Sequence, residues 1–238
     1  MASCLSWPID FPASSLLPKK RMVLALDLDD TLYHYRALFP EWGASMDDLL
    51  APWGGATLGW RAYTALKDAR EHFSRSRFAQ YVAEKLQAEQ VEEDTIAKVT
   101  DELTLRLGEV VVRAGTDPVL AGVPAMFAQA RAQGVGLVVV TTGDPSWQSE
   151  KAHAAGIIDA VDLCVVTETN AQKTEVCAWL CEQGARVWLI DDRAEVHERL
   201  ARAALPQVRQ FHFGGKGGAG EPLADWQSFE KLLTNHLA

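Results

Sequence analysis

Three aspartates stand within four residues at the end of an apolar run, in the stretch "MVLALDLDDTLYHY" at positions 22–35. The run at 22–26 is short and continuous, which predicts a strand that is covered on both faces. In extended chain, the side chains of Asp27 and Asp29 would point the same way, about 7 Å apart. Carboxylates this close repel one another and lose hydration where a fold closes over them. The spacing therefore predicts that a group of opposite charge is bound at this strand end.

Further apolar runs predict four more strands, at 136–140, 162–166, 186–190 and 208–213. Thr141 and Thr142 follow the second strand, Asp191 and Asp192 follow the fourth, and Lys173 precedes a helical segment. Ligands in open α/β sheets bind beyond the carboxyl ends of the strands, so we expect these side chains to converge. One lysine does not balance four carboxylates. Mg²⁺ would, since it favours carboxylate, water and phosphate oxygens.

The strands alternate with segments of helical period, which predicts a Rossmann-like α/β core with a parallel sheet in three layers. More than a hundred residues separate the first two strands, far beyond a normal crossover. Apolar residues recur there at three- and four-residue steps, and 61–90 holds neither Gly nor Pro. We therefore predict a loosely ordered leader at 1–20, a core domain at 21–33 and 117–238, and a helical cap domain at 34–116.

Composition narrows the class of protein. The 238 residues are 48% hydrophobic and carry a formal net charge of -9, which disfavours a general nucleic-acid binder. No run approaches membrane-spanning length, and the start does not read as a secretory signal. The four cysteines show neither a redox nor a zinc spacing. We expect reduced cysteines, a cytoplasmic location, and no membrane or nucleic-acid partner; the oligomeric state is open.

The order of these residues resembles the haloacid dehalogenase-like hydrolase superfamily. "DLDDT" (27–31) is similar to its first motif, Asp-x-Asp-x-Thr, and "VVVTTGD" to its second, with Thr141 as the motif residue. Lys173 resembles the third-motif lysine, although Thr174 follows it instead of the commoner proline. "LIDD" (189–192) resembles the fourth motif, and "TTGDPSWQSEKAHAAGI" the "TNG…Q…K…G" segment of phosphatase-like members. The insertion matches the helical cap of that subgroup.

The resemblance implies a Mg²⁺-dependent phosphatase that hydrolyses a small phosphorylated metabolite through an aspartyl-phosphate. Asp27 would be the nucleophile, and Asp29 would be the general acid and base. Dehalogenase members of the superfamily lack an acidic residue at the position of Asp29. Thr141 and Lys173 would hold the phosphoryl oxygens. Asp27, Asp191, Asp192 and the backbone carbonyl of Asp29 would hold the metal. Asp30 and Thr31 would organise the turn and a helix start by accepting backbone N–H groups.

Several alternatives stay open at this level. Thr142 competes with Thr141 for the phosphate. A phosphomutase of the same superfamily, or a non-catalytic module that keeps the fold, would share these motifs. "GGKGGAG" (214–220) lacks the Walker spacing and is interpreted as a surface loop. The six histidines show no ligand spacing, and we expect each to lie at the surface or in packing.

Overall fold

The computed structural model describes residues 4–9, 21–69, 72–215 and 218–237. The chain divides into two compact units, and each is described by itself. The first unit runs up to His34 and resumes over Val119–Ala238, and the second is Tyr35–Pro118. The insertion predicted at 34–116 differs from this division by one residue at its start and by two at its end.

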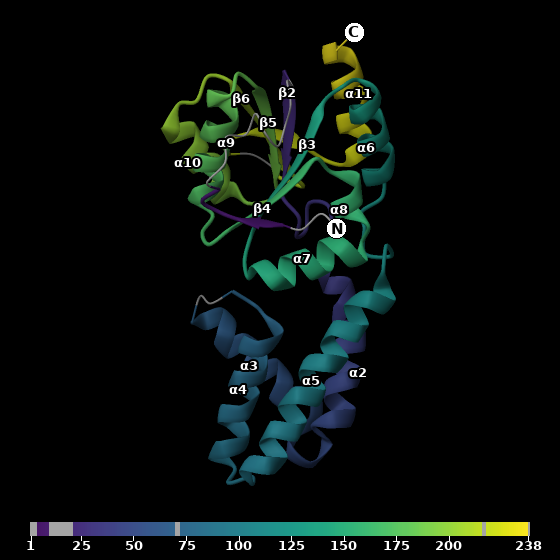
Figure 1. Cartoon of the computed structure of the whole chain (residues 1–238), viewed down its shortest axis with the longest axis vertical. Helices are drawn as coiled ribbons and strands as arrows, with labels where there is room; N and C mark the ends of the chain where they lie inside the picture. Colours follow the sequence, from purple (N-terminus) through teal and green to yellow (C-terminus); the bar gives the residue numbers. More distant parts are fainter. Residues whose placement is uncertain (1–3, 10–20, 70–71, 216–217, 238) are drawn as a thin grey trace. The chain divides into compact units, whose positions relative to one another are not determined.

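The first unit is an α/β core around a parallel sheet, which confirms the predicted Rossmann-like class. Among the described residues the sheet has seven strands in the order β1-β4-β3-β2-β5-β6-β7, and every neighbouring pair is parallel (Figure 1). The strands are β1 (Leu5–Ser6), β2 (Met22–Leu26), β3 (Gly136–Thr142), β4 (Leu163–Thr167), β5 (Arg186–Asp191), β6 (Val208–Phe213) and β7 (Glu221–Leu223).

Helices cover both faces of the sheet, with α9 and α10 on one side and α6 and α11 on the other (Figure 1). Alternate residues of the strands, such as Val23 and Ala25, pack with Val176 and Leu200 in the core on the α9 and α10 side. Burial on both faces explains why β2 reads as an unbroken apolar run. The helices of this unit are α6 (Val123–Ala132), α7 (Pro145–Ala154), α8 (Ile157–Ala160), α9 (Gln172–Glu182), α10 (Ala194–Ala203) and α11 (Trp226–Leu237).

All five predicted strands are present; β3 and β5 run further than predicted, and β4 is shifted by one residue to Leu163–Thr167. β3 includes Thr141 and Thr142, and β5 includes Asp191, so these residues end their strands instead of following them. The sequence pattern missed β1 and β7 at the two sheet edges. Two- and three-residue strands are too short to show a period, and Pro222 in β7 fits only an edge position.

The described part of the leader differs from the expectation of loose order. Its strand β1 pairs with β4, and the amide of Trp7 donates to the carbonyl oxygen of Val166 (2.8 Å); residues 1–3 and 10–20 lie outside the described residues. A disulfide joins Cys4 to Cys164, whereas Cys177 and Cys181 are free and buried. The expectation of four reduced cysteines is therefore wrong for this pair, because β1 brings two thiols that are far apart in sequence together. The cytoplasmic location stays a prediction, and four reduced cysteines no longer support it.

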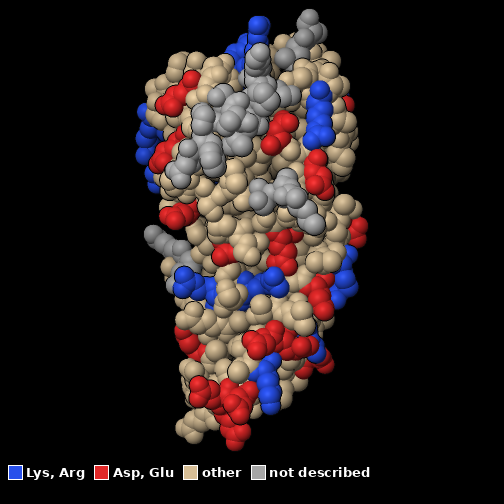
Figure 2. Space-filling view, in the orientation of Figure 1, with Lys and Arg blue, Asp and Glu red and all other residues tan. Residues whose placement is uncertain are grey.

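The second unit is a helical bundle in which α5 packs on both α2 and α4. Ile96, Val99, Leu103, Leu107 and Val110 are buried along α5, as their spacing predicts. Asp and Glu side chains gather at the end of the unit where α4 leads into α5 (Figure 2). Its elements are η1 (Tyr35–Leu38), α2 (Phe39–Leu49), η2 (Ala51–Trp53), α3 (Gly55–Asp68), α4 (Arg75–Ala88) and α5 (Glu93–Ala114).

The helical stretch predicted over 61–90 is two helices. Ser74 has extended backbone, and its hydroxyl oxygen accepts a hydrogen bond from the amide of Arg77 (3.2 Å), which caps a new helix at Arg75. The break needs neither Gly nor Pro, so a search for those residues does not find it.

In the part of the chain that the structure describes, every helix is too short or too polar to cross a membrane.

Candidate active site

The chain turns sharply after β2 and leaves Asp27 at the strand end. The amide of Asp27 donates to the carbonyl oxygen of Ile190 in β5 (3.0 Å), which ties the two strand ends together. The amides of Leu32 and Tyr33 both donate to the carbonyl oxygen of Leu28 (2.9 Å). The chain past Asp27 is therefore a tight loop and not extended strand.

The turn differs in detail from the one that the sequence predicts. Asp30 has φ of 58°, and its Oδ1 lies 3.2 Å from Nδ1 of His34. The hydroxyl of Thr31 is buried and has no hydrogen-bond partner among the described residues, and no helix begins there. The expected helix start at Asp30 and Thr31 is therefore wrong, because the chain closes a loop at this point.

Lys173 bridges two of the predicted carboxylates. It lies in the first turn of α9, and its Nζ is 2.7 Å from Oδ1 of Asp27 and 2.7 Å from Oδ2 of Asp191. The lysine is 1% exposed. Burial, the largest influence, would lower the pKa of Lys173, but the charges of Asp191 and Asp27 outweigh it and hold that pKa above its usual range. The ammonium group is therefore a fixed positive charge between two strand ends.

Asp27, Asp191 and Asp192 form an acidic trio at the ends of β2 and β5. One carboxylate oxygen of each lies within 4.8 Å of the other two. Burial raises the pKa of Asp27 to about 8; Lys173 lowers it and Asp191 raises it by smaller amounts. Burial, followed by the charge of Asp191, raises the pKa of Asp192 to about 6. The positive charges of Lys173 and Arg193 lower these pKa values, but both values stay raised, so the trio is not neutralised.

The trio fits a hard divalent cation. Oδ1 of Asp192 is buried and has no hydrogen-bond partner among the described residues, so a carboxylate oxygen is left without any donor. Such an atom is costly unless a cation uses it. A set of carboxylate oxygens suits Mg²⁺ better than a soft metal. Asp27, Asp191 and Asp192 are the residues that would hold it; the backbone carbonyl of Asp29 stays a predicted ligand.

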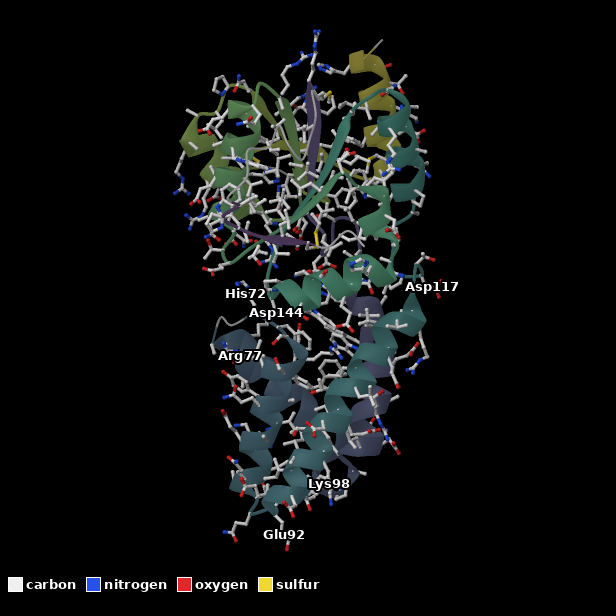
Figure 3. The ribbon with its side chains drawn as sticks, in the orientation of Figure 1. His72, Arg77, Glu92, Lys98, Asp117 and Asp144 are labelled. Atoms are coloured by element: carbon white, nitrogen blue, oxygen red, sulfur yellow. A yellow bond between two sulfur atoms is a disulfide. The ribbon has the colours of Figure 1, made fainter. Side chains whose placement is uncertain are left out.

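The carboxylate of Asp29 is paired with Lys151 and not with Lys173. Lys151 of α7 donates to both oxygens of Asp29, at 2.7 Å for Oδ2, and Gln148 Nε2 donates to Oδ2 at 3.1 Å. Gln148 Nε2 also donates to the carbonyl oxygen of Thr142 (3.0 Å). Asp144, labelled in Figure 3, caps α7 by accepting from the amide of Trp147 (2.8 Å). The cap fixes where α7 begins and so where Lys151 and Gln148 reach.

Sequence reasoning did not assign Lys151 or Gln148 to the site. Both lie in the "Q…K…G" run that was noted only as a resemblance, and Lys151 is 1% exposed. Their place in that run is the one sequence signal that could have found them, since the burial of Gln148 and Lys151 is known only from the fold. Long charged side chains are almost never buried unless they are paired.

Thr141 and Thr142 have different surroundings. Thr141 is 1% exposed, and its carbonyl oxygen accepts a hydrogen bond from the hydroxyl of Thr167 (3.2 Å). The hydroxyl of Thr142 lies 2.8 Å from that same Thr167 hydroxyl. Thr142 is thus already engaged with β4. Which of the two contacts phosphate stays a prediction.

Comparison with known proteins identifies the family of this chain. The model of haloacid dehalogenase-like hydrolases matches residues 22–204, which is most of the chain and includes the acidic trio, Asp29 and Lys173. The chain belongs to this family. No curated protein matches the sequence.

Solved structures of this hydrolase family share the fold at low sequence identity. A haloacid dehalogenase-like family hydrolase from Xanthomonas campestris has a TM-score of 0.60 at 16% identity, covering 92% of this chain and 93% of that one. The hydrolase YfnB from Bacillus subtilis, bound to magnesium, has a TM-score of 0.54 at 14% identity, covering 90% and 99%. A predicted phosphoglycolate phosphatase from Haemophilus somnus has a TM-score of 0.51 at 15% identity, covering 92% and 99%.

Proposed function

We propose that this hydrolase is a Mg²⁺-dependent phosphatase that acts on a small phosphomonoester through a covalent phosphate on Asp27. The observation that carries the proposal is the acidic trio with a buried Asp192 oxygen that has no donor, beside a lysine that spans Asp27 and Asp191. YfnB is similar to this chain in fold, and its structure is bound to magnesium, which supports the proposal of Mg²⁺ as the ion. Asp29 supports phosphate hydrolysis over dehalogenation, since the resemblance implies that dehalogenase members lack this acid.

In the first step, a carboxylate oxygen of Asp27 attacks phosphorus, and the bond from phosphorus to the leaving oxygen breaks. The leaving oxygen takes a proton from Asp29 and departs as the alcohol. Lys173 and Thr141 hold the phosphoryl oxygens, on which negative charge accumulates. Mg²⁺, when bound, neutralises charge on the phosphoryl oxygens and orients them against Asp27.

In the second step, Asp29 takes a proton from a water, and the water oxygen attacks phosphorus. The bond from phosphorus to Asp27 breaks, which releases inorganic phosphate and restores the carboxylate. Lys151 and Gln148 keep the carboxylate of Asp29 in one place during both steps. Residues 34–116 would act as a lid that excludes water and selects the leaving group, because closing segments commonly have this role.

The test is phosphate release by the purified protein from 4-nitrophenyl phosphate and a panel of phosphorylated metabolites, with Mg²⁺ and with chelator. We expect release only with Mg²⁺, none from Asp27→Asn, and a loss of about 10²- to 10⁴-fold in Asp29→Asn. Acid quenching should recover a phosphorylated protein whose label maps to Asp27. Equal release by Asp27→Asn, or release unaffected by chelator, would refute the proposal.

A further inference from the structure

Two buried histidines flank the acidic trio and are not explained by the mechanism. His197 lies in the first turn of α10 and is 0% exposed, and His212 lies in β6 and is 9% exposed. Their ring centroids are 5.0 Å apart. Neither ring touches the acidic carboxylates through any contact that the structure gives. Nε2 of each ring contacts the main chain that carries those carboxylates, and Nδ1 of His197 also lies 3.4 Å from Oε1 of Gln210.

Each histidine is hydrogen-bonded to one of two consecutive carbonyl groups. Nε2 of His197 is 3.0 Å from the carbonyl oxygen of Asp191, and Nε2 of His212 is 3.0 Å from the carbonyl oxygen of Asp192. A carbonyl oxygen can only accept, so Nε2 of each ring must carry the hydrogen. The two peptide groups that follow Asp191 and Asp192 are therefore both fixed by imidazole donors.

The fold explains why these two rings reach the same loop. β6 pairs with β5 in a register that sets His212 opposite Asp191, and α10 begins three residues after Asp191. Helical side chains lean toward the N-terminus of their helix, which directs His197 back over the strand end. Positions far apart in sequence thus meet at the main chain of the trio.

Two described glycines of the 214–220 stretch lie against this pair, Gly215 beside His212 and Gly220 beside His197. A Cβ at Gly215 would lie 2.3 Å from Cγ and 2.4 Å from Nδ1 of His212, so the ring occupies the space that any other residue would need. Nδ1 of His212 is buried there and has no hydrogen-bond partner among the described residues. The amide of Gly215 donates to the carbonyl oxygen of His212 (3.2 Å). Gly215 thereby gains a role that the surface-loop interpretation of 214–220 did not give it.

We infer that His197 and His212 are positioning residues for the metal: they hold the main chain of Asp191 and Asp192 so that both carboxylates face one ion. The inference rests on the metal site of the proposed function. The three carboxylates of the acidic trio repel one another, and hydrogen bonds to the main chain oppose the separation that this repulsion favours. Outer hydrogen bonds that orient metal ligands commonly account for about 10- to 100-fold in metal affinity.

The experiment measures metal binding directly, by Mg²⁺ calorimetry and by the electron spin resonance of bound Mn²⁺. His212→Leu and His197→Leu should each weaken binding by about 10- to 100-fold. His212→Gln, which keeps an N–H at a similar reach, should recover most of the loss. His153→Leu, at an exposed histidine of α7, is the matched control and should bind as the wild type does.

A second variant distinguishes a loss of positioning from a loss of folding. Gly215→Ala keeps His212 but moves it, and should also weaken binding, whereas Gly43→Ala, whose Cβ would meet only Trp60 at 3.9 Å, should not. Excess Mg²⁺ should restore turnover in the histidine variants, which a collapsed structure would not allow. Binding by His212→Leu and Gly215→Ala equal to wild type overturns the inference and leaves the proposed function intact. A wild type that binds no metal overturns both.

Discussion

Replacing Lys151 with methionine tests whether α7 holds Asp29, the proposed catalytic acid, in place. The lysine is 1% exposed, and its Nζ contacts both oxygens of Asp29, whose side chain is 23% exposed. Removing one partner of a buried pair costs about 3 to 5 kcal/mol, because the other charge is left buried and unpaired. Water reaches Asp29 and Gln148 still donates to it, so we expect the low end, a loss of about 3 kcal/mol in the free energy of unfolding.

A double-mutant cycle with Asp29→Asn separates pairing from packing. Lys151→Met leaves the partly buried Asp29 carboxylate without its lysine, and Asp29→Asn leaves the buried Lys151 ammonium without its carboxylate, whereas the double variant leaves neither charge. The double variant should therefore be more stable than the sum of the single losses predicts, by about 2 kcal/mol. Urea denaturation, with the transitions of the two units fitted separately, gives the four values. Lys98→Met, at an exposed lysine of α5 (Figure 3), is the control and should change stability little.

The same cycle in turnover tests the catalytic consequence. Lys151→Met should lower kcat by at least about tenfold, as expected when an acid–base residue loses its position. In the Asp29→Asn background the same replacement should lower kcat no further, because the group that it positions is already lost. A coupling in stability below about 0.5 kcal/mol, or independent losses of kcat, would refute the reasoning.

Four further outcomes follow from the structure. Lys173→Met should abolish phosphate release while the protein still folds, checked by circular dichroism, because it leaves Asp27 without its nearest cation. Apparent Mg²⁺ affinity, measured by calorimetry, should fall as pH drops below about 8, since the pKa of Asp27 is raised to about 8 and a proton then competes with the metal. For the same reason, metal-free protein should lose stability as pH rises from about 4 toward 8, because only the folded state keeps that proton. Gly122→Ala should destabilise more than Gly134→Ala in thermal melts: both have positive φ, but only the first Cβ would lie 2.9 Å from Cβ of Trp226.

The sequence predicts the sheet and the acidic residues because both are local patterns. Apolar runs mark β2 to β6, and Asp27, Asp191 and Asp192 stand directly at strand ends. Parallel strands bring their carboxyl ends to one edge, and the pairing of β2 with β5 then sets Asp27 beside Asp191 and Asp192. Lys173 follows from its place in the family's motif order.

The supporting contacts could not be predicted because they depend on packing between distant segments. Lys151 and Asp29 are 122 positions apart, and nothing in the spacing selects this pair. The imidazole donors at His197 and His212 serve carbonyl groups, which every residue carries, so no pattern of side chains records them. Cys4 meets Cys164 only because a two-residue strand joins the sheet edge. Such contacts become visible only once the register of each strand is known.

The insertion leaves and re-enters the core at neighbouring backbone positions. Tyr33 forms an antiparallel bridge with Val119, and the amide of Leu120 donates to the carbonyl oxygen of Leu32 (2.9 Å). These main-chain contacts fix the chain at both points where the insertion joins the core. The residues at the strand ends of the core therefore depend little on which side chains the insertion carries. Selection can therefore change the insertion, and so diversify the compounds that hydrolases of this family accept, while the acidic strand ends and Lys173 of the core are inherited unchanged.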